Sequence, residues 1–427
     1  MRIKVAYGQE GLWLNLPDGA RVTVLEPKFV PGLPDEQAAI REALRRPVGT
    51  PPLRELVRPE DTVAIAFSDL TRPMPSDRVL PVLLEELAHV PRENLTLFNA
   101  VGTHRPNTPE ELINILGREV AESYRIVQHN AFDPAELLFL DQTSFGHEAW
   151  VNRAFMAASV KILTGFIEPH LFAGLSGGPK AVLPGLAGER TTLGNHSPRM
   201  IENPQATWGI TQGNPIWEEM HEVALRIKPT FLLNVTLNKA REITGVFAGD
   251  MDQAHAAGVA FVRRSAMTSV LAPFDIVITS NSGYPLDLNL YQAVKGMSAA
   301  AQIVRQGGSI ILASECKDGI PDHGEYKRLL HMAKSPRQLL DIVTAPGFVC
   351  IDQWEAQLQA MIQLKADVYV KSSYLSDEEI RRALLIPAPD VDDTVRNLLR
   401  RYGPQATICV LPEGPQTIPY IKESGRI

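Results

Sequence analysis

The sequence predicts two α/β domains with mainly parallel sheets and an active-site cleft between them. Short apolar runs alternate with longer segments in which apolar residues recur at helical spacing, an order typical of parallel sheets covered by helices. Polar loops follow directly after several of the apolar runs, where α/β folds place their chemistry. The 427 residues are enough for about two or three domains.

The first half of the chain alternates between expected strands and helices. Apolar positions recur at helical spacing over residues 76–89, which predicts a helix there. Thr108 and Glu111 form a capping box that starts the next helix. Residues 166–215 are rich in Gly, Pro and Asn, and a loop of that length is usually functional. The other expected elements are strands at 62–67, 95–100, 160–165 and 230–237 and a helix at 216–227.

A second α/β unit is expected to begin near Thr268. This divides the chain into an N-terminal domain over 1–267 and a C-terminal domain over 268–427, and leaves open that the extreme C-terminus packs back on the first domain. A helix is expected over 289–305, ended by Gly307-Gly308. The remaining expected elements are strands at 274–279, 309–313, 367–371 and 406–411 and helices near 335–344, 352–364, 376–384 and 389–402.

Composition excludes several classes of function. The hydrophobic fraction of 44% and charged fraction of 21% are those of an ordinary water-soluble protein. A net charge of −7 without a block of basic residues argues against a nucleic-acid surface. We find no signal peptide and no apolar run of about 18 residues, so we expect no membrane contact and a cytoplasmic location. Cys316, Cys350 and Cys409 are widely separated, which excludes a disulfide framework and a CxxC metal site.

Three histidines lie in tight loops of small and turn-forming residues: His104, His170 and His196. Histidine exchanges a proton or holds a metal near neutral pH. His104 and His170 are candidates for general acid–base chemistry, although a lone loop histidine is more often structural. His196 has no second histidine at metal-ligand spacing, so a metal there would need further ligands from a cofactor.

Two pairs of polar residues are candidates for binding an anionic substrate. Asp69 and Arg72 follow an expected strand, and arginine suits a bidentate grip on a carboxylate. The alternative for this pair is a salt bridge in a surface loop. Gln292 and Lys295 share one face near the start of an expected helix, where an anion is favoured. The alternative for that pair is a solvated helical face.

Lys180 follows the turn Gly177-Gly178-Pro179 and precedes an apolar stretch. The segment lacks the spacing of a Walker A motif. Lysine is rarely buried unpaired, so covalent attachment and phosphate binding are both open as functions. The structural alternative is a lysine whose ammonium reaches solvent.

Six of these segments together resemble the nickel-pincer lactate racemase family. They occur in the family's order and are Asp69-Leu70-Thr71-Arg72-Pro73, Gly102-Thr103-His104-Arg105-Pro106, Glu168-Pro169-His170, Gly177-Gly178-Pro179-Lys180, Asn195-His196 and Tyr291-Gln292-Ala293-Val294-Lys295-Gly296.

The resemblance implies a cofactor, a reaction and partners. The cofactor is the nickel-pincer nucleotide, a pyridinium-3-thioamide-5-thiocarboxylic acid mononucleotide joined to Lys180 as a thioamide. Its pyridinium C4, its two sulfurs and His196 hold Ni. The reaction is racemisation or epimerisation of a 2-hydroxy acid, lactate or a related acid, by reversible hydride transfer from Cα through a 2-keto acid. The implied partners are this small-molecule substrate and the cofactor maturation proteins.

The resemblance also implies a role for the other site residues. His104 and His170 match the two catalytic acid–bases. Arg72, Gln292 and Lys295 match the residues that orient the substrate, and Asp69 matches their partner in substrate binding. A rival hypothesis is a zinc-dependent hydrolase or lyase that uses the three histidines with Asp69. A second rival is a non-enzymatic carrier or maturation partner that binds nickel or the cofactor without turnover.

Overall fold

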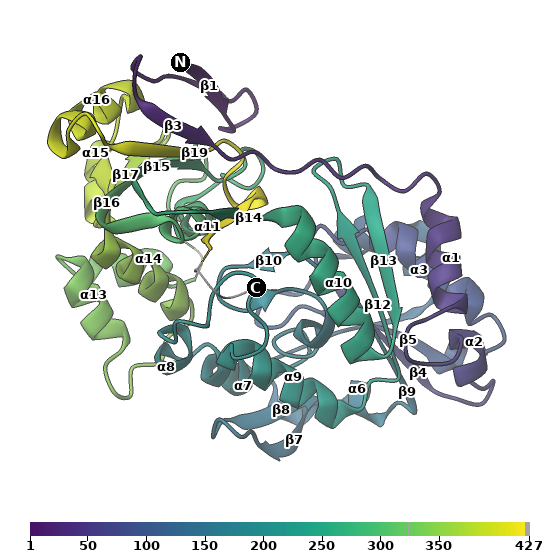
Figure 1. The fold of residues 1–427 in the computed structure, drawn as a ribbon. Coiled ribbons are helices and arrows are strands. Elements are labelled where there is room, and N and C mark those ends of the chain that lie inside the picture. Colours follow the sequence, from purple (N-terminus) through teal and green to yellow (C-terminus); the bar gives the residue numbers. More distant parts are fainter. Residues whose placement is uncertain (323, 423–427) are drawn as a thin grey trace. The chain divides into compact units, whose positions relative to one another are not determined.

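The computed structural model describes residues 1–322 and 324–422 (Figure 1). By its internal contacts the chain forms two compact units. The larger is Phe29–Ser265, and the other combines Met1–Lys28 with the described chain from Ala266 on. Each unit contains a mainly parallel sheet, which confirms the predicted α/β class. Among the residues described, none of the helices combines the length and apolar character that a membrane span requires.

The sheet of the larger unit has the strand order β13-β12-β9-β4-β5-β6, and all neighbours are parallel except β12 and β13. The central strands β4 and β9 are buried almost throughout, as expected for a parallel sheet covered on both faces. The strands of this sheet are β4 (Val63–Ser68), β5 (Leu95–Ala100), β6 (Arg125–Gln128), β9 (Val160–Phe166), β12 (Phe231–Leu237) and β13 (Ile243–Gly249).

Helices and short strands complete the larger unit. The predicted capping box is present, because Thr108 and Glu111 each accept a hydrogen bond from the other's backbone amide. The helices are α1 (Glu36–Arg45), α2 (Leu53–Leu56), α3 (Ser76–Glu86), α4 (Pro109–Leu116), α5 (Arg118–Ser123), α6 (Arg153–Ala157), α7 (Glu189–Asn195), α8 (Pro198–Ile201), α9 (Pro215–Ile227) and α10 (Met251–Ala266). The short strands are β7 (Leu137–Gln142), β8 (Glu148–Asn152), β10 (Pro169–His170) and β11 (Gly174–Leu175).

The second sheet has the order β18-β17-β16-β15-β19-β3, with every pair parallel. Its strands are β3 (Arg21–Val24), β15 (Phe274–Ser280), β16 (Val304–Ala313), β17 (Ala366–Lys371), β18 (Ile386–Pro387) and β19 (Thr407–Leu411). The helices of this unit are α11 (Leu290–Ala301), α12 (Tyr326–His331), α13 (Pro336–Val343), α14 (Gln353–Lys365), α15 (Asp377–Arg382) and α16 (Val391–Tyr402). Two strand pairs accompany them: β1 (Arg2–Val5) with β2 (Leu12–Asn15), and β14 (Met267–Val270) with β20 (Ile418–Ile421).

The first 28 residues fold with the second unit, whereas the division expected at residue 267 assigned them to the first domain. β3 pairs with β19 at the edge of the second sheet, and Figure 1 shows the N-terminal strands beside the C-terminal ones. The β1–β2 hairpin adds Val5 and Leu14 to a core that contains Ile276 and Val410. Burial of these apolar side chains holds the segment in this unit.

One expected boundary in the second unit is wrong. The helix expected over 289–305 ends at Ala301, and β16 begins at Val304 and runs through Gly307-Gly308. A Cβ on Gly308 would lie 2.8 Å from the backbone oxygen of Asp275. Gly308 therefore lets β16 approach β15 closely and does not end a helix.

Candidate active site

The expected site residues of the larger unit lie at the carboxyl ends of its central strands. β4 pairs with β5 on one side and with β9 on the other, so the strand order reverses between β4 and β9. Open α/β sheets bind ligands in the crevice at such a reversal. Asp69 and Arg72 follow β4, His104 follows β5, and His170 follows β9.

Asp69 and His104 form a hydrogen-bonded pair. His104 Nδ1 lies 2.8 Å from Asp69 Oδ2, and Thr71 Oγ1 donates to Asp69 Oδ1 at 2.8 Å. Burial alone would raise the pKa of Asp69, but the hydrogen bond from His104 and the charges of His104 and Arg72 hold it below its ordinary value. An ionised Asp69 accepts a hydrogen bond from the Nδ1–H of His104. Neutral His104 then carries a free lone pair on Nε2.

His170 is held in the opposite tautomer. It lies in the hairpin of β10 and β11, and the Ala173 backbone amide donates to His170 Nδ1 at 3.2 Å. Neutral His170 therefore carries its proton on Nε2. The hairpin depends on Gly174, whose φ is +75° and whose added Cβ would lie 1.9 Å from the Ile210 carbonyl oxygen.

The ring of Phe172 contacts both His170 and His196. Its ring makes edge-to-face contacts with both imidazoles, at centroid distances of 4.6 Å to His170 and 4.9 Å to His196. His196 caps the C-terminal end of α7 and is buried. Burial and the positive charge of Lys180 lower the pKa of His196 to about 3. His196 is therefore a neutral imidazole at physiological pH, the form that ligates a metal.

The turn that carries Lys180 is packed against two buried side chains that sequence reasoning missed. The Gly178 amide donates to Asn234 Oδ1 at 2.8 Å. A Cβ on Gly178 would lie 2.7 Å from the ring of His255, and one on Gly177 would lie 2.5 Å from Asn234 Oδ1. A side chain at Gly177 or Gly178 would collide with Asn234 or His255, so both positions require glycine. Asn234 interrupts the mainly apolar run of β12, and this interruption was the available sequence signal.

A buried carboxylate, Glu219, binds the side chain of Asn195, the residue before His196, and no sequence motif marks this carboxylate. Glu219 on α9 accepts from Thr143 Oγ1 at 2.6 Å and from His147 Nδ1 at 2.8 Å. Its other oxygen accepts from Asn195 Nδ2 at 3.0 Å. Since Asn195 is the last residue of α7, this network fixes the end of the helix from which His196 projects.

Gln292 and Lys295 belong to the second unit and lie together on α11. Lys295 Nζ donates to Gln292 Oε1 at 2.8 Å, so the shared helix face expected from their spacing is present. Asn289 caps α11 by accepting from the Gln292 amide at 3.0 Å. α11 follows β15 and therefore starts at the carboxyl end of the second parallel sheet.

The three histidines do not form a metal site by themselves. Within residues 1–322 and 324–422, no three His, Cys, Asp or Glu side chains are grouped so that they could hold a metal ion. The cluster that a zinc hydrolase would build from the histidines and Asp69 is thus not found among the described residues. Asp69 instead accepts a hydrogen bond from His104.

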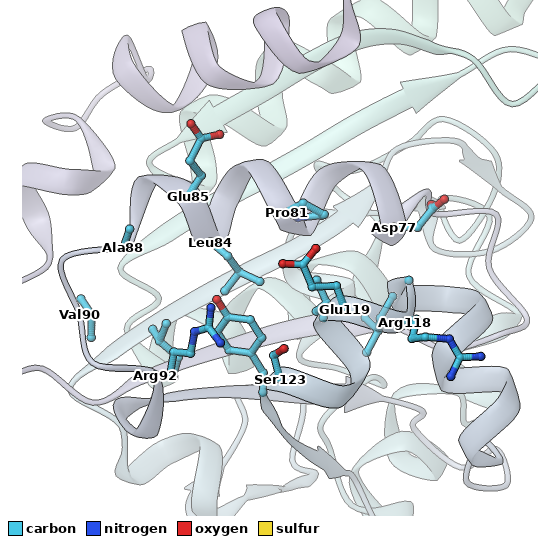
Figure 2. Close-up of a pocket in the computed structure, with 15 residues that line it drawn as sticks. Asp77, Pro81, Leu84, Glu85, Ala88, Val90, Arg92, Arg118, Glu119 and Ser123 are labelled. Atoms are coloured by element: carbon cyan, nitrogen blue, oxygen red, sulfur yellow. The ribbon is translucent and has the colours of Figure 1, made fainter.

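A cavity of about 530 Å³ lies elsewhere in the larger unit. Figure 2 shows Asp77 and Leu84 of α3 and Glu119 of α5 on its walls, and Tyr124 also lines it. None of the expected site residues is among the residues that line it. The cavity is therefore separate from the histidines.

Comparison with known proteins matches both parts of the chain to one family. The protein-family model for the lactate racemase N-terminal domain matches residues 7–209. The family model for the lactate racemase C-terminal domain matches residues 270–418. A lactate racemase of Lactiplantibacillus plantarum is 37% identical over 382 residues, covering 89% of this chain and 90% of that protein. A lactate racemase of Thermoanaerobacterium thermosaccharolyticum is 34% identical over 422 residues, covering 97% and 98%.

Two solved structures are similar to this chain in fold. The lactate racemase apoprotein from Thermoanaerobacterium thermosaccharolyticum matches with a TM-score of 0.92 at 33% identity, over 99% of this chain and 100% of that chain. A protein from Thermotoga maritima matches with a TM-score of 0.67 at 18% identity, over 92% of this chain and 100% of that chain. The second match concerns the fold alone.

Proposed function

The chain belongs to the lactate racemase family, and from this premise we propose that it interconverts the enantiomers of a 2-hydroxy acid, lactate or a related acid. The observation that carries the proposal is the pair of loop histidines whose rings are each oriented by a hydrogen bond at Nδ1. His104 can accept a proton on Nε2, and His170 can donate one from Nε2 when its ring is the imidazolium. A racemase needs such a group for each of the two enantiomers.

The nickel-pincer nucleotide fits the residues of the larger unit. Buried, neutral His196 would supply one ligand, and the nucleotide would supply soft sulfurs and a carbon, which suit nickel. The charge of Lys180 acts on His196, which supports attachment of the nucleotide at Lys180 beside the metal ligand. When bound, the group would accept and return the hydride of the substrate Cα. The maturation proteins that make it are proposed partners.

Asp69 and His104 carry the first proton transfer. His104 Nε2 accepts the substrate hydroxyl proton as the Cα hydride leaves, which gives the 2-keto acid. Ionised Asp69, 2.8 Å from Nδ1, stabilises the imidazolium that forms. Thr71 donates to the second oxygen of the carboxylate and fixes its orientation.

His170 serves the opposite enantiomer. In its imidazolium form, His170 gives the Nε2 proton to the substrate oxygen as the hydride returns to the turned keto carbon, and a neutral imidazole is left. The Ala173 amide keeps the ring oriented with Nε2 directed away from the backbone of the hairpin. The reverse reaction exchanges the roles of the two histidines, because the same path is followed backwards.

Cationic side chains hold the substrate carboxylate while the keto group turns. Arg72 is suited to a bidentate grip, and its charge already acts on Asp69. Gln292 orients the Lys295 ammonium through the 2.8 Å hydrogen bond. Fixing the carboxylate this way keeps the reacting carbon in place between the two bases.

The direct test is racemisation by protein co-expressed with the cofactor maturation proteins. We expect either pure enantiomer of lactate, or of a related 2-hydroxy acid, to give the racemic mixture, measured by chiral chromatography. We also propose a cytoplasmic location. Cofactor-loaded protein that binds these acids without racemising any of them would favour the carrier hypothesis and reject this one.

A further inference from the structure

The loop that carries His104 is held at its far end by two amide side chains. Asn99 is on β5 and Gln128 is on β6, and the two residues lie opposite each other in the register of the sheet. Each is at or near the carboxyl end of its strand. Asn99 is fully buried and Asn107 nearly so, which strengthens the hydrogen bonds that these amides make.

Gln128 binds both backbone groups of Asn107. The Asn107 amide donates to Gln128 Oε1 at 2.6 Å, and Gln128 Nε2 donates to the Asn107 carbonyl oxygen at 2.9 Å. Asn99 Nδ2 donates to Gln128 Oε1 at 3.2 Å and to Asn107 Oδ1 at 2.8 Å. Two residues of an antiparallel sheet exchange their bonds in the same pairwise manner. Asn107 is therefore fixed to the edge of the sheet.

The near end of the same loop is fixed as well. The Gly102 amide donates to the Gly185 carbonyl oxygen at 3.0 Å. Gly102 has a φ of +59°, and an added Cβ would lie 3.2 Å from the Pro184 carbonyl oxygen. His104 thus lies on a short loop between two anchors, one at Gly102 and the other at Asn107.

We propose that Gln128 is a positioning residue for the first proton transfer, because it holds the loop where the His104 ring meets Asp69. The inference rests on the proposed function, which assigns that transfer to His104. The His104 side chain is 45% exposed, so its position depends on the path of the loop more than on packing around the ring. Its 2.8 Å hydrogen bond to Asp69 weakens steeply when the loop is displaced.

The first measurement is the steady-state kinetics of the Gln128→Ala holoenzyme with D- and L-lactate. The variant loses both bonds to Asn107, so the end of the loop can shift. We expect kcat to fall by roughly 10–10²-fold in both directions, the order of loss that a displacement of about 1 Å causes in an active site. KM should change by less than about threefold, because the residues proposed to bind the carboxylate follow β4 or lie on α11.

The second measurement reports the state of His104 without catalysis. NMR of the full-length apoprotein with isotopically labelled histidine nitrogens distinguishes the two neutral tautomers. At about pH 8 wild-type His104 should carry its proton on Nδ1, which donates to Asp69. In Gln128→Ala the signal should move toward the Nε2–H form. The spectrum of His104→Gln, which lacks this signal, identifies it.

The matched control is Asn238→Ala in the same unit. Asn238 Nδ2 donates to the Val30 carbonyl oxygen at 3.2 Å, and Asn238 Oδ1 accepts from the Glu242 amide at 3.0 Å. This amide also binds two backbone groups, but they belong to other segments. Its loss should lower the melting temperature and leave both kcat and the His104 signal unchanged.

A second variant answers the question if Gln128→Ala does not fold. Gln128→Glu keeps the bond from the Asn107 amide and loses only the donation to the Asn107 carbonyl oxygen. Its kcat should still fall at least about threefold, and the His104 signal should move in the same direction.

The outcomes separate this inference from the proposed function. A kcat in Gln128→Ala equal to that of Asn238→Ala overturns the inference, and so does an unchanged His104 signal. An unchanged kcat in Gln128→Glu overturns it too. A near-normal kcat in His104→Ala would instead reject the proposed function of His104, whatever the loop does.

Discussion

The buried carboxylate of Asp69 lies 2.8 Å from Nδ1 of His104, and only 4% of Asp69 is exposed, whereas 45% of the His104 side chain is. The pair thus combines an inaccessible anion with an accessible imidazole. Asp69 fixes the tautomer and orientation of His104, and the exposed edge of the ring is the part that can meet a substrate.

Replacing Asp69 by Asn should therefore damage catalysis more than folding. The amide can still contact His104, but it favours the wrong tautomer and no longer stabilises the imidazolium. We expect kcat to fall by roughly 10²–10⁴-fold in both directions. Racemisation kinetics of cofactor-loaded Asp69→Asn measure this. Thr71→Val, which removes only the second hydrogen bond to Asp69, should cost less than about tenfold. Near-normal kcat in Asp69→Asn would reject the role of the pair.

Loss of either histidine base should slow both directions of the reaction, since every racemisation cycle uses both. His104→Ala and His170→Ala should each cost roughly 10²–10⁴-fold. The 2-keto acid should be detectable after acid quench of the wild-type enzyme. An alanine variant that slows only one direction would show that the two histidines do not act in one cycle.

Substitutions at Lys180 and at His196 should have different effects, because the first residue is proposed to attach the cofactor and the second to bind the metal. Lys180→Ala should abolish both the added mass of the protein and all activity. His196→Ala should keep the added mass but lose nickel, because the metal loses its protein ligand. Intact-protein mass spectrometry and metal analysis measure these outcomes. An unmodified Lys180 in fully active enzyme, or zinc in place of nickel, contradicts the assignment.

His255 should make the apoprotein sensitive to acid. Burial lowers the pKa of His255 to about 4, despite its hydrogen bond to the Ser176 carbonyl oxygen. Its contribution to stability is therefore complete above about pH 6.5 and is lost as pH falls toward 4. At pH 5 the free energy of unfolding should be lower by about 2 kcal/mol on this account.

Thermal melting of the apoprotein between about pH 7.5 and 4 tests this dependence. His255→Gln can keep a donor toward Ser176 but does not titrate, so its melting temperature should fall less with acid than that of the wild type. Replacing His89, which is exposed, by Gln should leave the wild-type dependence unchanged. Parallel curves for the wild type and His255→Gln would contradict the prediction.

The sequence predicted most of the parallel strands because they are mainly apolar runs followed by polar loops, but it did not predict β6 or β18. The same local pattern located Asp69, His104 and His170 at strand ends. It could not predict that β3 pairs with β19, since four-residue strands carry little signal and the pairing joins opposite ends of the chain.

The supporting residues were also beyond prediction from local pattern. Glu219 and His255 lie among other polar residues on their helices, and their partners come from distant segments. The roles of these residues follow from contacts between segments far apart in the chain, and the spacing of residues along the sequence does not predict such contacts.

The most direct test of the central claim is the fate of a deuterium label at the Cα of the substrate. Lactate deuterated at Cα should keep its label in the product enantiomer, because the hydrogen leaves and returns as a hydride and does not exchange with water. Mass spectrometry of the separated enantiomers after partial racemisation in ordinary water measures it. Retained deuterium is the predicted result. Replacement of the label by solvent hydrogen would show that Cα loses a proton, and would contradict the proposed mechanism.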